Sequence, residues 1–90
     1  MRIVRTDTFK RDFQALSAQL KRRTEQALRF LLSDPHHPSL HTKRIRGTRN
    51  YWEARVTRSH RLIFTMEADA YTLYAVGPHD IVDRFARGHR

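Results

Sequence analysis

The chain has 90 residues, 39% of them hydrophobic and none of them cysteine, and its 18 lysines and arginines against nine acidic residues give a formal net charge of +9 at pH 7. This length and hydrophobic content predict one domain spanning residues 1–90 with a thin core, and they exclude a disordered chain, which would hold fewer large apolar side chains at this charge. The sequence has no cysteine for a disulfide, and we expect neither a membrane span of roughly 20 apolar residues nor a signal peptide with an apolar core of about 7 to 15 residues. These features fit a cytoplasmic protein.

The N-terminal third predicts a short strand at residues 2–5 followed by two helices. Thr6 or Asp7 can cap the first helix, because a short side-chain oxygen accepts hydrogen bonds from the first free amides. Apolar residues then recur at steps of four, three and four, which is a helical stripe. We expect a break near residues 17–21, and one long bent helix is the alternative. The stripe is Phe9, Phe13, Leu16 and Leu20, and the inner face of the second helix is Ala27, Leu28, Leu31 and Leu32.

The remainder of the chain predicts a series of strands. The second helix ends before Pro35, because proline disfavours helical geometry in the residue before it. A loop follows, then a short strand or edge segment at residues 43–47 and a turn that begins at Gly47. Three strands and a short C-terminal helix complete the chain. We place the strands at residues 51–57, 61–66 and 71–76 and the helix near residues 81–87.

This order of elements predicts an α+β domain, with the N-terminal strand and two-helix hairpin packed on one face of an antiparallel sheet of about four to five strands. The two-residue period of a strand divides the side chains between the two faces of the sheet. We expect the second face to stay open to water. The core face receives Trp52, Ala54, Val56, Leu62, Phe64 and Met66, and the open face receives Tyr51, Glu53, Arg55, Arg61, Ile63, Thr65 and Tyr74.

The excess of basic residues predicts a polyanionic partner. A pI near 11.3 is typical of proteins that bind nucleic acid or an acidic protein, although a merely solvated basic surface is the alternative. Basic residues interleaved with aromatic ones suit a single-stranded nucleic acid, since phosphates meet the cations and bases stack on the rings. We expect Trp52 to belong to the core. The predicted RNA-binding residues are Lys43, Arg44, Arg46, Arg49 and Tyr51.

Arg61 and Arg55 are the first candidates for chemistry. They lie on neighbouring predicted strands across a tight turn, and two guanidinium groups held in this way can bind one phosphate and stabilise charge that develops on it. The alternative is a surface ion pair between Arg61 and Glu53, worth about 0 to 1 kcal/mol. We expect Arg61 to lie at the edge of an open face, where truncation costs about 0.5 kcal/mol of stability or less.

His79 is the second candidate, because histidine is the side chain best suited to move a proton near neutral pH. It follows a Gly-Pro turn and precedes Asp80. Glu53 and Asp80 are alternative proton carriers. The adjacent pair of histidines at 36–37 lacks the spacing of metal ligands, so we predict no metal site. We interpret His36, His37, His41 and His89 as loop residues.

Several short motifs follow the strand and helix pair in a fixed order. They are residues 34–40, 43–47, 52–56, 60–64 and 76–80. In order and spacing these segments, which extend over nearly the whole chain, resemble the RelE/ParE superfamily of small bacterial toxins from type II toxin–antitoxin pairs. In the RelE-like branch, which cleaves mRNA in the ribosomal A site, an arginine before an apolar triplet contacts the scissile phosphate, and Arg61 matches it. Some members carry a catalytic histidine just after the last strand, and His79 matches it.

The resemblance implies a ribosome-dependent mRNA endoribonuclease that needs no cofactor and that a cognate antitoxin holds silent. Arg61 and Arg55 would stabilise the phosphorane-like charge while His79 acts as general acid or base. Its implied partners are the antitoxin, mRNA and the ribosome, with no membrane. Two alternatives stay open: a ParE-like inhibitor of DNA gyrase without chemistry, and an inactive toxin-fold binding protein. Both are favoured by Asp83 and Phe85, which stand where many cleaving members have a tyrosine.

Overall fold

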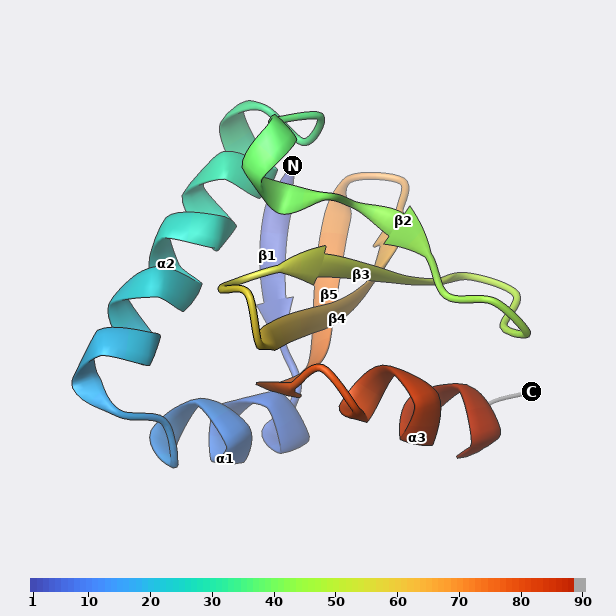
Figure 1. Cartoon of the computed structure of the whole chain (residues 1–90). Helices are drawn as coiled ribbons and strands as arrows, with labels where there is room; N and C mark the ends of the chain where they lie inside the picture. The colour runs from blue at the N-terminus through green and yellow to red at the C-terminus, as the bar shows by residue number, and fades with distance from the viewer. Residues whose placement is uncertain (89–90) are drawn as a thin grey trace.

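The computed structural model of the chain describes residues 1–88, and in these residues five strands form one sheet that packs against three α-helices (Figure 1). The predicted α+β class and the predicted C-terminal helix are confirmed. Every helix within residues 1–88 is too short or too polar to traverse a lipid bilayer. His89, interpreted above as a loop residue, lies outside the described residues. In chain order the elements are β1 (Arg2–Arg5), α1 (Asp7–Gln14), α2 (Ala18–Ser33), the 3-10 helix η1 (Pro38–Leu40), β2 (Lys43–Arg44), β3 (Tyr51–Arg55), β4 (His60–Glu67), β5 (Ala70–Pro78) and α3 (Ile81–Gly88).

The sheet has the strand order β1-β5-β4-β3-β2. The predicted antiparallel pairing holds for β2 to β5. β1 adds a parallel strand at the edge, with Arg2 opposite Ala70 and Arg5 opposite Leu73. A parallel pair cannot be joined by a tight turn, and here the helices and three strands lie between the two partners in sequence. The sheet is therefore mixed.

Two capping residues set the boundaries of the first two helices. Thr6 Oγ1 accepts a hydrogen bond from the Phe9 amide at 3.2 Å and donates one to the Leu73 carbonyl at 2.8 Å. It therefore starts α1 and fixes α1 against β5 at the same point. Ser17 Oγ accepts a hydrogen bond from the Leu20 amide at 3.2 Å, so α2 begins at the predicted break. The two-helix hairpin is confirmed over one long bent helix.

The main core lies between α1, α2 and one face of the sheet, as predicted. Trp52 and Met66 are partly buried and pack against it. Leu32 was predicted to face inward but is 46% exposed, because it lies at the edge of the apolar stripe of α2. Thr24 is fully buried instead, and its hydroxyl donates to the Leu20 carbonyl at 2.8 Å. The buried members of this core are Phe9, Ala27, Leu28, Leu31, Leu40, Ala54, Val56, Leu62, Phe64, Tyr71, Leu73 and Val76.

The second face of the sheet is not open, and this expectation is wrong because α3 covers part of it. Ile63 and Thr65 were placed on the open face, but they are 0% and 4% exposed. α3 packs on β4 and β5. Gly77 permits the approach, since a Cβ at this position would lie 3.2 Å from Ile81 Cγ2. A second, smaller apolar layer therefore lies on this side of the sheet, and only its margin remains for binding.

A β-bulge in β5 completes this second layer. Ile63 pairs with Ala75 but Phe64 pairs with Leu73, which leaves Tyr74 as the extra residue. The ring centres of Tyr74 and Tyr51 lie 5.3 Å apart, and those of Tyr51 and Phe85 in α3 lie 4.7 Å apart. Burial raises the pKa of the Tyr51 phenol, and the nearby Tyr74 and Glu67 raise it further. Tyr51 is therefore a neutral, half-buried ring at physiological pH rather than a fully available stacking platform.

Candidate active site

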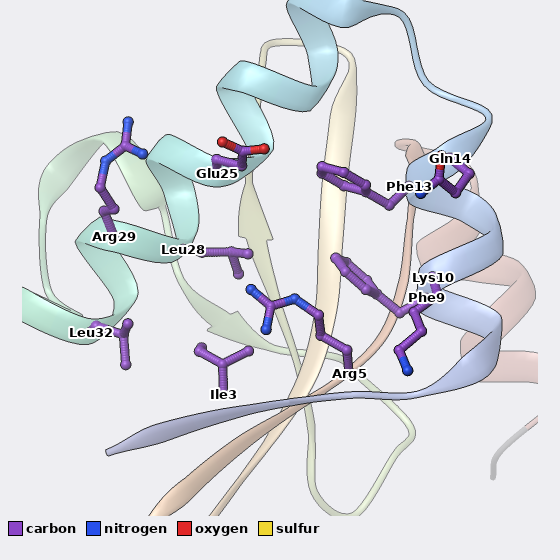
Figure 2. A pocket seen from close by; sticks show the side chains of 10 residues that line it. All are labelled: Ile3, Arg5, Phe9, Lys10, Phe13, Gln14, Glu25, Leu28, Arg29 and Leu32. Atoms are coloured by element: carbon purple, nitrogen blue, oxygen red, sulfur yellow. The ribbon is translucent and has the colours of Figure 1, made fainter.

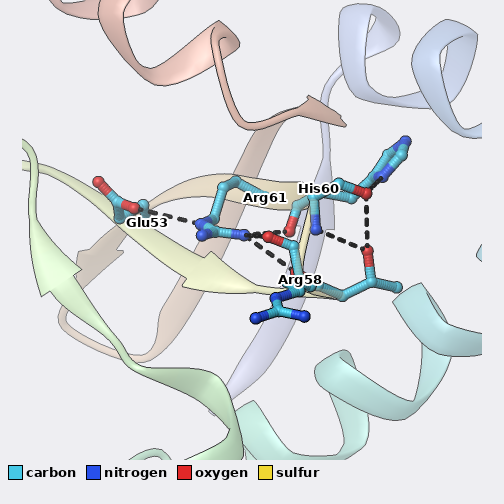
Figure 3. A network of polar contacts seen from close by, with 6 residues as sticks. Glu53, Arg58, His60 and Arg61 are labelled. Carbon is cyan, nitrogen blue, oxygen red and sulfur yellow. Dashed lines mark hydrogen bonds and ion pairs between the residues drawn. The ribbon is translucent and has the colours of Figure 1, made fainter.

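Arg61 lies in β4 directly opposite Arg55 of β3, and the turn between the two strands holds its guanidinium (Figure 3). Nη1 donates to the carbonyls of Thr57 at 3.0 Å, Arg58 at 3.2 Å and His60 at 3.0 Å. Nε lies 3.6 Å from Glu53 Oε1. Arg61 therefore closes the β3–β4 turn from one side.

The ion pair between Arg61 and Glu53 is largely removed from water. The two side chains are only 16% and 11% exposed, so this is not the surface pair considered from the sequence. Removing one partner of a buried pair leaves the other charge uncompensated, which is strongly destabilising. The expectation that Arg61 could be truncated without a stability cost is therefore wrong.

Arg55 carries a buried hydrogen-bond donor that the described residues leave without a partner. Its Nε is buried and has no hydrogen-bond partner among residues 1–88. A buried donor without a partner costs about 1 to 3 kcal/mol. An acceptor brought within hydrogen-bond distance of this atom would remove that cost.

Arg55, Arg61 and Glu53 line a common pocket of 320 Å³ at the β2 side of the sheet, which we call the edge pocket. Lys43 also lines the pocket, because it lies directly opposite Glu53 in the register of the antiparallel strands β2 and β3. Three cations thus converge beside one carboxylate. The cations can bind a phosphodiester and stabilise added negative charge, and a carboxylate next to them can accept a proton. The complete lining is His41, Thr42, Lys43, Glu53, Arg55 and Arg61.

His79 and Asp80 lie at the same end of the sheet. The His79 amide donates to the Ser59 carbonyl at 2.7 Å, which ties the end of β5 to the β3–β4 turn. The His79 side chain is exposed, and no hydrogen bond or ion pair within the described residues joins it to the edge pocket. Asp80 forms an exposed ion pair with Arg84 at 3.6 Å. The structure thus places His79 beside the turn that also holds Arg61. The carboxylate of Asp80 instead interacts with Arg84 of α3.

The predicted RNA-binding residues divide into two groups. Lys43, Arg44 and Arg46 are exposed along the β2 edge and line a pocket of 410 Å³ together with Glu53 and residues of α3. The Arg44 guanidinium carbon lies 5.3 Å from the Trp52 ring centre, a cation–π contact that fixes its side chain. Arg49 is exposed in the loop before β3 and does not line this pocket. The β2 edge therefore presents a continuous basic margin beside the edge pocket.

Sequence reasoning missed three residues that the fold brings to this region: Arg23 of α2, His41 after η1, and Arg58 of the β3–β4 turn. His41 adopts a left-handed backbone conformation with φ 44°, which is uncommon for a residue other than glycine. All three residues line a pocket with Arg55. Their positions in sequence gave no sign of this proximity, because they come from separate elements.

Comparison with known proteins identifies the family and the fold to which this chain belongs. The family model of the ParE-like toxin domain matches residues 18–88. The chain belongs to the ParE-like toxin family. No curated protein matches it in sequence. The predicted membership of the RelE/ParE superfamily is thereby confirmed.

Solved structures of toxins share the fold. The YoeB/ParE toxin from Agrobacterium tumefaciens superposes with a TM-score of 0.75 at 19% identity, over 88% of this chain and 99% of that one. RelE in the RelB–RelE antitoxin–toxin complex from Methanococcus jannaschii gives 0.72 at 16% identity, over 91% and 96% of the two chains. YafQ from E. coli gives 0.73 at 15% identity, over 89% and 94%. At these identities the likeness establishes the RelE-like fold of this toxin-family chain.

Proposed function

We propose that this ParE-like family member is the toxin of a type II toxin–antitoxin pair and that it arrests translation by cleaving mRNA on the ribosome. The observation that carries the proposal is the edge pocket, where Lys43, Arg55 and Arg61 surround the nearly buried carboxylate of Glu53. Phosphodiester cleavage needs positive charge around the phosphate and a group that moves protons. The edge pocket supplies both within a single small cavity.

The reaction is attack by the RNA 2′-hydroxyl on the adjacent phosphorus, with loss of the 5′-oxygen of the next nucleotide. Arg55 and Lys43 bind the non-bridging oxygens, and Arg61 adds charge while holding Glu53 in place. Glu53 accepts the proton of the 2′-hydroxyl, and His79 at the neighbouring strand end delivers a proton to the leaving oxygen. The ribosome orients the strand, and positioning of this kind can supply about 7 to 11 kcal/mol of the barrier.

The partner that silences the toxin fits a groove on the opposite side of the molecule from the β2 edge. This groove of 480 Å³ lies between β1, α1 and α2. Figure 2 shows Phe9 and Phe13 of α1 facing Leu28 and Leu32 of α2 across it. Its charged lining residues are mostly basic, with Arg5, Lys10 and Arg29 against the single acid Glu25. An antitoxin segment with apolar residues on one face and acidic residues at its margins matches this groove.

The exposed Leu32 gives a test of the antitoxin groove. Leu32→Glu places a negative charge among the apolar residues of the groove and lowers its net positive charge. Antitoxin affinity should fall by about tenfold or more, as for a truncated interface anchor, while folding is retained because Leu32 is 46% exposed. Glu25→Gln is the matched control and should bind at least as well as the wild type. Unchanged binding of Leu32→Glu would remove the groove from the interface.

A gyrase-directed ParE-like function without chemistry is the second candidate. Phe85 favours it, because Phe85 stands where many RNA-cleaving members of the superfamily have a tyrosine. Its ring packs on Tyr51 and Tyr74 and offers no hydroxyl for proton transfer. The lack of any bond between the His79 side chain and the edge pocket in the described residues points the same way.

Reconstituted translation of a defined mRNA distinguishes the two functions. Primer extension should reveal cuts at the ribosomal A site with the wild type, and Glu53→Gln and His79→Gln should each lower the cutting rate by about a hundredfold. A parallel supercoiling reaction with gyrase should proceed normally. Intact mRNA together with blocked supercoiling would establish the second candidate instead.

A further inference from the structure

A second pocket, of 620 Å³, lies between α2, η1 and the β3–β4 turn, and we call it the turn pocket. Three arginines from separate elements border it: Arg23 of α2, Arg55 of β3 and Arg58 of the turn. In Figure 3 the Arg58 guanidinium points away from the network around Arg61 and toward the side on which α2 lies. The complete lining is Arg23, Gln26, Ala27, Phe30, Ser39, Leu40, His41, Arg55, Val56, Thr57 and Arg58.

The turn pocket has no internal counter-charge. Its lining within residues 1–88 contains no aspartate or glutamate. None of its three arginines takes part in an ion pair of the described residues, which join Arg2 to Asp69, Arg61 to Glu53 and Arg84 to Asp80. Like charges that border one cavity repel each other, and a bound anion offsets this repulsion because it attracts each of them.

Arg55 supplies an independent sign of a missing acceptor, since its buried Nε donates to no protein atom among the described residues. Arg55 and His41 each border both the turn pocket and the edge pocket. An anion in the turn pocket therefore lies next to whatever occupies the edge pocket. The planar fork of arginine matches the oxygens of a phosphate group bidentately.

We propose that the turn pocket binds a second phosphate of the RNA backbone, neighbouring the phosphate in the edge pocket, with Arg23, Arg55 and Arg58 as its ligands. The identity of the ligand as RNA rests on the proposed function, whereas the affinity for phosphate rests on the pocket alone. The turn pocket is a binding subsite that fixes which nucleotides of the RNA lie on either side of Arg55.

The test compares two double variants of equal charge. Arg23→Gln with Arg58→Gln removes the two exposed ligands, and Arg11→Gln with Arg22→Gln removes two exposed helical arginines outside the turn pocket. Affinity for a labelled single-stranded RNA is measured over a range of salt concentrations. The pocket variant should bind about tenfold or more weakly, and its log–log salt slope should fall by about 0.7 for each lost phosphate contact. The control variant should change less than about twofold.

An equal loss of affinity in both double variants would overturn the proposal, because it would show only the effect of net charge. A titration with inorganic phosphate, followed through the Arg55 Nε–H resonance, separates the sources of phosphate. A shift of this resonance in the wild type, combined with full RNA affinity of the pocket variant, would overturn RNA as the ligand in favour of free phosphate. RNA binding that depends on the pocket without any mRNA cleavage would uphold the turn pocket and contradict the proposed function.

Discussion

Arg61 joins three backbone carbonyls of the β3–β4 turn to the buried carboxylate of Glu53. Arg61→Ala would leave those carbonyls and Glu53 without their donor, so we expect a loss of about 1 to 3 kcal/mol in the free energy of unfolding. Arg58→Ala in the same turn removes an exposed side chain and should cost about 0.5 kcal/mol or less. Denaturant unfolding of both variants measures the difference. Equal stabilities would show that Arg61 does not hold the turn.

Tyr51 gives a pH-dependent prediction at the same scale. Its pKa in the folded protein is raised above the ordinary value of 10.0 because burial disfavours the phenolate. A raised folded-state pKa contributes stability that is fully present below the unfolded pKa and is lost as the pH rises through the folded one. The wild type should therefore lose more stability than Tyr51→Phe above about pH 10. Urea unfolding of both proteins at about pH 9 and about pH 11 measures this; parallel losses would contradict it.

Residue-level prediction from the sequence succeeded where a local pattern decides and failed where the fold decides. The two-residue strand period placed Ala54, Leu62 and Phe64 in the core correctly. The partners of Arg61 are turn carbonyls whose direction no spacing encodes. The turn pocket joins Arg23 to Arg58 across 35 positions, so it depends on how α2 meets the sheet.

Among the elements, α3 depends on a close contact with β5 at Gly77. A Cβ at Gly77 would lie 3.2 Å from Ile81 Cγ2, so Gly77→Ala and Ile81→Ala should be coupled. The cost of Gly77→Ala should be smaller in the Ile81→Ala background than in the wild type, by about 0.5 kcal/mol or more. Gly88→Ala, where a Cβ meets nothing within 4 Å, should show no coupling with Ile81→Ala. Additive effects at Gly77 would show that α3 is not seated as described.

Element boundaries were largely predictable because side chains at the ends encode them. Thr6 and Ser17 cap their helices, and Pro35 follows the end of α2. The position of α3 was not predictable from its own eight residues. The available signal was Ile63, an apolar residue on the face expected to be open, which α3 now helps to cover. The parallel pairing of β1 with β5 also lacked a local signal, since parallel partners are distant in sequence.

For the whole molecule, the net charge of +9 and the division of its two sides fit a toxin that meets two different partners. In the proposed function the apolar groove between α1 and α2 would receive the antitoxin, and the basic edge and turn pockets would receive RNA. A positive surface of this kind accelerates encounter with RNA and makes the binding dependent on salt.

Pulse-labelling of bacteria in which the chain is induced without an antitoxin tests the central claim most directly. Incorporation of labelled amino acids and of labelled thymidine is followed separately after induction, with His79→Gln, which changes an exposed side chain, as the inactive control. The proposed function predicts that protein synthesis stops first, while DNA synthesis continues, and that the control stops neither. DNA synthesis that stops before protein synthesis would contradict mRNA cleavage as the function of this protein.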